Sequence, residues 1–437
     1  MNKQNQRGPI RKSLARMGIL LVAVLMAGWI FTMPRPAAYG LWKTEGYGFI
    51  LDVSPLKIDL YDVTAVSCFR SMRLPANNFL LDQLGDGLQI SGENDQLRID
   101  AALNPIYGTT ISSLPANCTS ESNADPELNY EIFWHTFNEH YPFFDLHGVD
   151  WDARYAEIRP QVTSTTSDEE LWEMMLATFD GLDDGHTWLT DNQTKGYSPA
   201  SGAEWDADYQ VYRTYLRDGF IEVPKAKITY GWLTDEIGYL EIAQMESETR
   251  FFQDRLALIA SVLEDASAEF SSASTLVIDI RSNPGGFDQY ALAIAEHFTP
   301  EAALAFSKTT RTGSGYTAPF EVYLTQSQAS RFEQGIYLLT SDATGSGAEI
   351  FTLAMGTLPQ VTSVGQPTRG ALSDVLAKEL PNGWSFGLSN QIYYAADGNV
   401  YEGIGVPADI DFPFDRDSMI MGRDTLLEEV IRLAENR

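Results

Sequence analysis

Residues Tyr337–Met355 read "YLLTSDATGSGAEIFTLAM". The apolar opening predicts a buried strand, the polar middle a turn, and the apolar spacing at the end an amphipathic helix. Ser346 lies between two glycines where the strand passes into the helix. This serine is either part of a tight connection that tolerates only small residues, or a nucleophile exposed to a substrate. The helix would direct unpaired N–H groups, first that of Gly347, toward an oxyanion.

The surrounding sequence alternates in the same way from about residue 225 to 437. Strand patterns such as "IGYLEIAQM" and "STLVIDI" alternate with helical patterns such as "RFFQDRLALIASVLEDA" and "DTLLEEVIRLAENR". This alternation predicts an α/β core over 225–437. Thr344 stands where a G-x-S-x-G motif requires glycine, so the turn is not the nucleophile elbow of the α/β-hydrolases.

Three further segments carry candidate site residues. "DIRSNPGG" ends in Gly285 and Gly286, which let a backbone approach either a substrate carbonyl or merely a neighbouring segment. "LDDGHTWL" places His186 in a Gly-Asp turn, where an imidazole can act as a general base. "NVYEGIGVPADIDFP" contains Glu402, a carboxylate that either orients a histidine or is simply solvated. No histidine pair has a zinc spacing, so we expect no metal and no cofactor.

Two segments precede the core. Residues 125–195 have apolar residues at helical spacing, with Ser167 as an expected N-cap, and predict a helical segment that contains the "DGHT" stretch. Residues 45–118 have short strand patterns between turn residues and predict a small all-β domain. Cys68 and Cys118 are a candidate disulfide, and two buried free thiols are the alternative.

The N-terminus differs from the rest in charge. Residues 1–16 are basic and predicted to be cytoplasmic, and residues 17–33, "MGILLVAVLMAGWIFTM", are seventeen residues without a charge. As a helix they would be about 26 Å long, a marginal membrane span. They are either a signal anchor or a cleaved signal peptide. In both cases we expect an exported, periplasmic or extracytoplasmic protein, anchored to the inner membrane in the first case.

The whole chain has 60 acidic and 30 basic residues, a net charge of −30. This balance disfavours nucleic acid as a partner. The sequence does not indicate an oligomeric state.

Taken together, four blocks resemble the tail-specific, or C-terminal processing, serine peptidase family, which includes the tricorn core and the interphotoreceptor retinoid-binding proteins. The blocks are "FDGLDDGHTWL", "LVIDIRSNPGG", "LLTSDATGSGAEIF", and "VTSVGQPTRG" with "YEGIGVPADI". The resemblance covers roughly residues 127–437. It implies an α/β core of the crotonase/ClpP type, with the helical segment and the small β domain in front.

The resemblance also implies roles for single residues. Ser346 becomes the nucleophile, and its oxyanion donors become Gly347 and either Gly285 or Gly286. The processing branch uses a lysine directly after the glycine of its "VGxxTxG" block, but Ala371 occupies that place and Lys378 lies seven residues further on. The tricorn branch uses a histidine, so we expect His186 as the base and Glu402 as the carboxylate that orients it.

Family members often carry a PDZ domain after the "DGHT" block, and about 40 residues between His186 and "ITYGWL" are too few for one. The expected function is a serine peptidase that hydrolyses peptide bonds of exported proteins or peptides through an acyl-enzyme. The alternatives are a non-catalytic ligand-binding member of the same fold, like the retinoid-binding proteins, and a membrane-tethered scaffold. Reaction with a serine-directed probe separates the enzyme from both.

Overall fold

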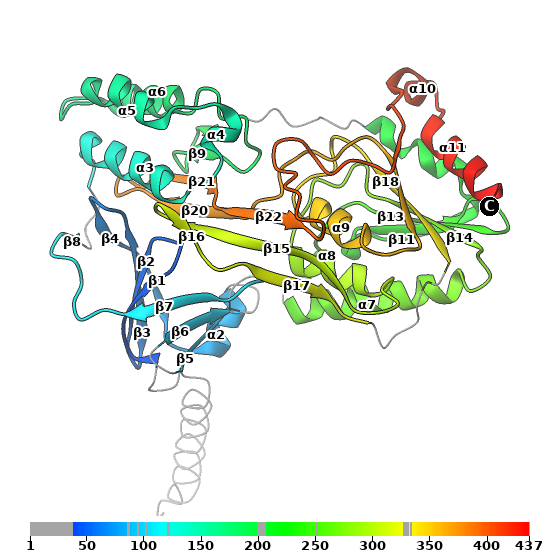
Figure 1. Cartoon of the computed structure of the whole chain (residues 1–437), viewed down its shortest axis with the longest axis horizontal. Coiled ribbons are helices and arrows are strands. Elements are labelled where there is room, and N and C mark those ends of the chain that lie inside the picture. The colour runs from blue at the N-terminus through cyan, green and yellow to red at the C-terminus, as the bar shows by residue number, and fades with distance from the viewer. Residues whose placement is uncertain are drawn as a thin grey trace, which may run out of the picture. The chain divides into compact units, whose positions relative to one another are not determined.

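The computed structural model describes residues 38–436, except 85–87, 94–95, 101–102, 120–122, 199–206, 250–251, 327–331 and 333 (Figure 1). The predicted membrane segment at 17–33 lies outside the described residues. Within the described part, no helix is both long and apolar enough to cross a membrane. The chain divides into two compact units, of which the first holds Phe49–Tyr61, Cys68–Thr119 and the residues up to Glu45. The second holds Gly46–Gly48, Asp62–Ser67 and Ser120–Arg437.

The first unit is built on one eight-stranded sheet in the order β5-β6-β7-β1-β2-β3-β4-β8. Its elements are β1 Gly40–Thr44, β2 Phe49–Val53, β3 Lys57–Val63, β4 Cys68–Pro75, α2 Asn78–Leu84, β5 Gln89–Glu93, β6 Gln96–Asp100, β7 Ile106–Thr110 and β8 Cys118–Thr119. Trp42, Leu51 and Ile58 belong to its buried core. The unit is rich in β-structure, as predicted, and α2 is a helix that the strand patterns did not indicate.

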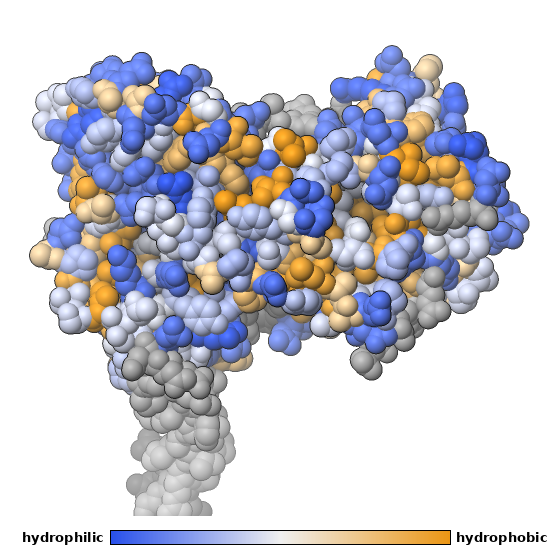
Figure 2. Space-filling model, in the orientation of Figure 1, coloured by the Kyte–Doolittle hydropathy of each residue, from blue (hydrophilic) through white to orange (hydrophobic). Residues whose placement is uncertain are grey.

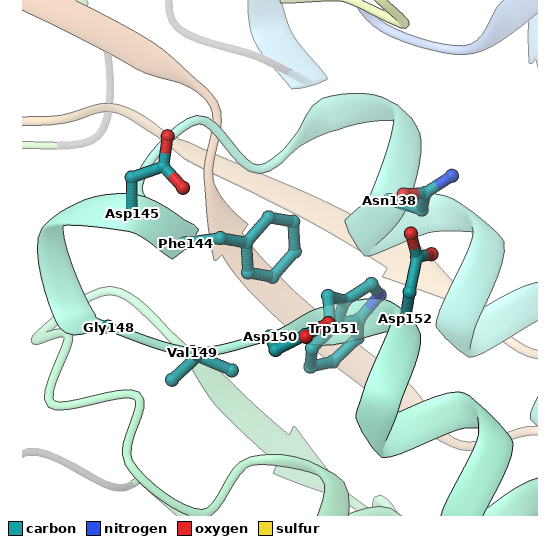
Figure 3. A pocket seen from close by; sticks show the side chains of 8 residues that line it. All are labelled: Asn138, Phe144, Asp145, Gly148, Val149, Asp150, Trp151 and Asp152. Atoms are coloured by element: carbon teal, nitrogen blue, oxygen red, sulfur yellow. The ribbon is translucent and has the colours of Figure 1, made fainter.

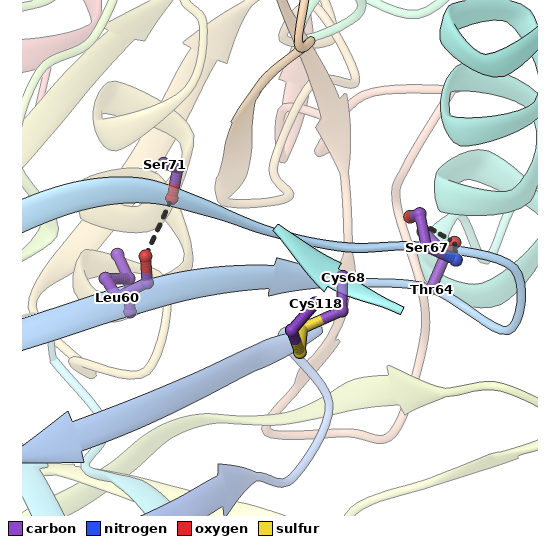
Figure 4. Close-up of a disulfide and its surroundings, with 6 residues drawn as sticks. All are labelled: Leu60, Thr64, Ser67, Cys68, Ser71 and Cys118. Atoms are coloured by element: carbon purple, nitrogen blue, oxygen red, sulfur yellow. Dashed lines mark hydrogen bonds between the residues drawn. A yellow bond between two sulfur atoms is a disulfide. The ribbon is translucent and has the colours of Figure 1, made fainter. Parts of the chain in front are cut away.

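A disulfide joins Cys68 and Cys118, as the sequence predicted (Figure 4). The two cysteines are register partners in the parallel pair of β4 and β8, which brings their Cα atoms to 4.4 Å. The bond closes a loop across 50 residues of sequence. It ties the last short strand of the unit to the edge of the sheet.

The second unit begins with the predicted helical segment. Its elements are α3 Pro126–His140, α4 Phe144–His147, α5 Trp151–Ile158, η2 Arg159–Gln161 and α6 Asp168–Thr178. Ser167 caps α6, where its hydroxyl accepts the N–H of Glu170 and the Glu170 carboxylate accepts the N–H of Ser167. The rings of Phe133 and Phe137 pack against Phe179 and so hold α3 to the end of α6.

A seven-stranded sheet forms the centre of the α/β core, in the order β11-β12-β13-β14-β18-β19-β23. Its strands are β11 Arg217–Val223, β12 Ile228–Trp232, β13 Ile237–Ile242, β14 Thr275–Asp279, β18 Gly335–Thr340, β19 Val361–Gly365 and β23 Ile410–Asp411. The pairs from β13 to β23 are parallel, and β11, β12 and β13 pair antiparallel. Because the parallel strands share a direction, the loops that follow them gather at one edge.

Helices cover both faces of this sheet. They are η3 Ala207–Tyr215, η4 Pro224–Ala226, α7 Phe252–Glu269, α8 Asp288–Glu296, α9 Gly347–Met355, α10 Arg416–Ile420 and α11 Thr425–Glu435. Leu427 of α11 packs on the face that carries Tyr239 and Val277. Phe270, at the end of α7, packs against Gly238 on the opposite face, and Figure 1 shows α7 and α11 on opposite sides.

Two smaller four-stranded sheets complete the unit. One has the order β10-β9-β21-β20, and in the other β15 pairs with β16, β17 and β22. Their strands are β9 Trp188–Thr190, β10 Gly196–Tyr197, β15 Ala303–Thr312, β16 Gly315–Tyr316, β17 Phe320–Leu324, β20 Val375–Glu379, β21 Ser385–Ser389 and β22 Gln391–Ala395. Figure 2 shows hydrophilic residues over α5 and α6 and around α10 and α11.

Candidate active site

The loops that follow β14, β18 and β19 bring the predicted residues together at the carboxyl edge of the large sheet. Ser346 lies between β18 and α9, and Gly285 and Gly286 lie between β14 and α8. His186 arrives from a different part of the chain, the loop between α6 and β9. Its Nε2 atom lies 3.1 Å from Ser346 Oγ. Residues 160 positions apart thus form the pair that nucleophilic catalysis requires.

The backbone of Ser346 is strained. Its φ of +50° with ψ of −125° is a conformation that residues with a Cβ rarely adopt. Such strain costs about 1–3 kcal/mol and persists only where the surroundings hold it. The Ser346 N–H donates to Glu349 Oε2 at 2.9 Å, while the hydroxyl faces His186. The strain therefore separates the hydroxyl from its own helix and presents it to the imidazole.

The glycines next to Ser346 are positioned as oxyanion donors. A Cβ on Gly285 would lie 2.6 Å from Ser346 Cβ and 2.9 Å from the Gly347 nitrogen, so only glycine fits. Among the described residues, neither the Gly347 N–H nor the Gly286 N–H donates a hydrogen bond to the backbone or to a side chain. Both remain available for a developing oxyanion.

The sequence left Gly285 and Gly286 as alternatives for the second oxyanion donor, and the structure favours Gly286. The Gly285 N–H donates to Asn283 Oδ1 at 2.9 Å, and the Asn283 amide donates to the Ile242 carbonyl. Gly285 is therefore a spacer beside Ser346, and Gly286 is the better candidate of the two predicted donors. Asn283 was not predicted, although an asparagine two residues before a Gly-Gly pair is a known turn signal.

Asp184 fixes the backbone on which His186 stands. Its Oδ1 accepts the N–H of His186 at 2.8 Å and the hydroxyl of Ser389 at 3.0 Å. Burial lowers the pKa of His186 below its ordinary value, while Asp184 and Asp374 oppose this shift and Arg369 adds to it. The imidazole is therefore neutral at pH 7 and able to accept a proton.

Glu402 does not have its predicted contact. Its Oε2 accepts the N–H groups of Leu372 and Ser373 at 2.9 and 3.0 Å. Among the described residues, no hydrogen bond or ion pair joins it to His186. The sequence showed a carboxylate in a Gly-rich turn, but it did not show that the 372–373 backbone would reach it first. The Ser373 backbone itself raises the pKa of His186, and Glu402 holds that backbone through the Ser373 N–H.

Glu349 is a site residue that the sequence analysis did not name. Besides the Ser346 N–H, it accepts the Thr368 hydroxyl at 2.7 Å, the Gly370 N–H at 2.6 Å and the Ala371 N–H at 2.8 Å. It is fully buried, and burial raises its pKa. The S-x-x-E spacing from Ser346 to Glu349 was a visible signal for a residue that holds a helix start.

Burial also raises the pKa of Glu402 well above its ordinary value, with Asp184 and Glu349 adding to the shift. The buried carboxyl groups of Asp184, Glu349 and Glu402 thus hold the backbone segments next to Ser346 and His186. Their hydrogen-bond donors are backbone N–H groups and hydroxyls rather than cations, and Asp184 Oδ2 has no donor among the described residues.

Lys378, which lies seven residues beyond the lysine place of the processing branch, has its partners elsewhere. Its Nζ donates to Asp62 Oδ1 at 2.6 Å and to the carbonyls of Tyr47 and Gly48 at 2.8 and 3.1 Å. These three bonds use all the donors of an ammonium group. Lys378 therefore contributes to packing, and the lysine place of the processing branch stays occupied by Ala371.

A separate hollow of about 450 Å³ lies in the helical segment. Figure 3 shows the rings of Phe144 and Trp151 between the carboxylates of Asp145 and Asp152. Asp150, also in its lining, caps α5 by accepting the Ala153 N–H. The hollow contains none of the residues around Ser346. Among the described residues, no group of three or more His, Cys, Asp or Glu side chains is arranged to hold a metal ion.

Two family models match parts of this chain. The family model described as Peptidase family S41 matches residues 236–412, and the model of the tricorn protease C1 domain matches residues 122–179. A carboxy-terminal-processing protease of Bartonella bacilliformis is 23% identical over 198 residues. That match covers 43% of this chain and 42% of the relative, so the chain spans less than half of the curated relative's length.

Two solved structures have a similar fold. A candidate peptidase from Parabacteroides merdae is 27% identical, with a TM-score of 0.63, over 71% of this chain and 97% of that one. Mature CPAF in complex with lactacystin is 12% identical, with a TM-score of 0.53, over 72% of this chain and 99% of that one. The predicted family resemblance and the mixed α/β fold are confirmed. Residues 236–412 of this chain are thus similar to peptidase family S41, and residues 122–179 before them to the tricorn protease C1 domain.

Proposed function

We propose that this protein is a serine peptidase that hydrolyses peptide bonds through an acyl-enzyme on Ser346, with His186 as the general base. The observation that carries the proposal is the 3.1 Å distance between His186 Nε2 and Ser346 Oγ. In the processing branch of the family the serine is paired with a lysine. Here Ala371 occupies the place of that lysine, and the neutral imidazole of His186 acts as the general base instead.

The reaction follows from the positions of these groups. Ser346 Oγ attacks the peptide carbonyl carbon while its proton passes to His186 Nε2. The Gly347 and Gly286 N–H groups hold the oxyanion, and His186 returns the proton to the departing amine as the C–N bond breaks. Water then attacks the ester, gives a proton to His186 and releases the acid, after which the proton returns to Ser346 Oγ.

Glu402 has a positioning role in this proposal. It holds the Leu372 and Ser373 backbone beside the imidazole, and Asp184 holds the histidine's own N–H. The set is therefore Ser346 and His186 in contact, with the two carboxyls acting through backbone. This differs from a triad in which the acid receives the imidazole N–H.

The test compares the full chain with Ser346→Ala, His186→Ala and His135→Gln, using a fluorophosphonate probe and an unfolded protein substrate. His135 is a partly exposed histidine between Glu131 and Glu139 and serves as the matched control. Labelling and cleavage should fall at least about a thousandfold in the first two variants and stay at the parent level in His135→Gln. Full labelling of a folded His186→Ala protein would remove His186 as the base.

We also propose that the protein works outside the cytoplasm on exported proteins or peptides, held to the inner membrane by residues 17–33. The Cys68–Cys118 disulfide supports this location, because such bonds persist in oxidising compartments. The basic flank before residue 17 supports the orientation. Protease added to spheroplasts should digest the chain, and alkaline extraction should leave it in the membrane fraction. A protease-protected chain with reduced cysteines would contradict the proposal.

A further inference from the structure

Arg369 lies directly beside the reacting pair. Its own N–H donates to the Thr344 carbonyl at 2.9 Å, which fixes it to the nucleophile turn. A Cβ placed on Gly345 would lie 3.3 Å from Arg369 Cδ, and one placed on Gly185 would lie 3.6 Å from Arg369 Nε. The side chain therefore runs between the residue that precedes Ser346 and the residue that precedes His186.

The charge of Arg369 has no partner in the described part of the chain, where its guanidinium makes no ion pair and donates no hydrogen bond. The fully buried cations in the described part of this unit each have an acidic partner. Arg281 pairs with Asp279 and Asp424, Lys308 with Asp374, and Lys378 with Asp62. The half-buried guanidinium of Arg369 also differs from that of Arg311, which is half-buried too but donates to three backbone carbonyls.

The buried carboxyls of the site do not explain this cation. Asp184, Glu349 and Glu402 receive backbone N–H groups and hydroxyls, and none of them lies within ion-pair distance of Arg369. A guanidinium presents a planar fork of donors that matches a carboxylate in two parallel hydrogen bonds. The Arg369 guanidinium is therefore suited to bind a carboxylate that comes from outside the chain.

We propose that Arg369 is a specificity-determining residue that binds a substrate carboxylate close to the scissile bond. The proposal rests on the peptidase function proposed above. The carboxylate is either an acidic side chain next to the cleaved bond or the free C-terminus of a peptide cleaved near its end. Both present the same chemistry to the guanidinium.

Binding of such a substrate would also act on the base. The charged groups that face His186 are Asp184, Asp374 and Arg369, and the arginine disfavours the protonated imidazole. A carboxylate on Arg369 offsets that positive charge, so the imidazole accepts the serine proton more readily in the complex. Recognition and proton transfer are thereby linked at one residue.

The experiment measures kcat/KM of the full chain on matched hexapeptides around one cleavable bond. In the first pair, one peptide has Glu and the other has Gln beside the cleavable bond. In the second pair, one peptide has a free C-terminus and the other has an amidated one. The parent should prefer the charged member of at least one pair about tenfold or more, and the pair that responds identifies the source of the carboxylate. Arg369→Gln should abolish this ratio, mainly through KM, and Arg369→Lys should retain part of it.

Arg423→Gln is the control, because Arg423 is an exposed arginine paired with Glu428. The ratio of kcat/KM between the charged and the neutral peptide should be the same in this variant as in the parent. Labelling of Ser346 by the fluorophosphonate reports folding of the Arg369 variants independently of the peptide. A parent that cleaves the peptides without charge preference, or an Arg369→Gln protein that keeps the ratio, overturns the proposal for Arg369 alone. A parent that is neither labelled nor active overturns the peptidase function, and this proposal with it.

Discussion

At the scale of single residues, the strained backbone of Ser346 has a measurable consequence. Glycine adopts a φ of +50° without cost, whereas alanine keeps the strain of the serine. We expect both Ser346→Gly and Ser346→Ala to be inactive, and Ser346→Gly to be more stable by about 1 kcal/mol in urea unfolding. Ser385 in β21 is the control, since it is an ordinary strand residue bonded to Asn192. There the glycine variant should be the less stable one, and equal stability of the two Ser346 variants would argue against the strain.

The pH dependence of hydrolysis tests the state of His186. Burial lowers its pKa from the ordinary value of 6.5, so the imidazole stays neutral to a more acidic pH than a solvated histidine does. As the pH falls through this lowered pKa, the imidazole gains a proton and can no longer act as a base. The acid limb of kcat/KM should therefore lie below pH 6.5.

An acid limb above pH 7 would mean that another group accepts the serine proton. Arg369→Gln, measured on the amidated neutral peptide, removes a cation that disfavours the imidazolium, so its limb should move to higher pH than that of the parent.

At the scale of elements, Glu349 joins the start of α9 to the loop after β19. Glu349→Ala leaves the N–H groups of Ser346, Gly370 and Ala371 and the Thr368 hydroxyl without their acceptor inside the protein. We expect a loss of about 3–5 kcal/mol in the free energy of unfolding, and a smaller loss for Glu349→Gln, which keeps one acceptor oxygen.

Glu170 offers a matched comparison, because it sits in the same S-x-x-E spacing at the start of α6 but is exposed. Glu170→Ala should lose clearly less stability than Glu349→Ala, because water replaces the exposed carboxylate as an acceptor. If the two alanine variants lose the same stability, the buried network around Glu349 does not hold the turn.

The elements of the core could be predicted from sequence because their patterns are local. The buried run in β18, the turn around Ser346 and the apolar spacing of α9 are all visible in one stretch of chain. The helix α2 was missed, although Asn77 accepts the N–H of Leu80 as an N-cap would. Its seven residues lie among strand patterns, and so short an apolar run fits a strand as well as a helix.

The site was predictable where a residue type and its glycine neighbours set the role, as at Ser346 and His186. It was not predictable where the partner is a backbone group brought in by the fold. Asn283 removes the Gly285 N–H from the oxyanion donors, and the 372–373 backbone takes the Glu402 carboxylate. Arg369 has no motif of its own, and its place is set only when the loops after β18 and β19 meet.

At the scale of the whole molecule, the two compact units predict separate roles for the disulfide and the active site. Cys68 and Cys118 both belong to the first unit, whereas Ser346, His186 and all the contacts described for them belong to the second. Closing a loop of this length in the unfolded chain contributes about 4 kcal/mol to the stability of the folded state. The double variant Cys68→Ser/Cys118→Ser should therefore lose stability in the first unit, seen as earlier proteolysis within residues 38–119.

The same variant should keep fluorophosphonate labelling of Ser346 at the parent rate, because no group of the site depends on the bond. The parent treated with a reducing agent is the chemical counterpart of the variant, and it should behave in the same way. Loss of labelling while residues 120–436 still resist proteolysis would show that the first unit supports the site. In that case the reactivity of Ser346 depends on the first unit as well as on the groups described around it.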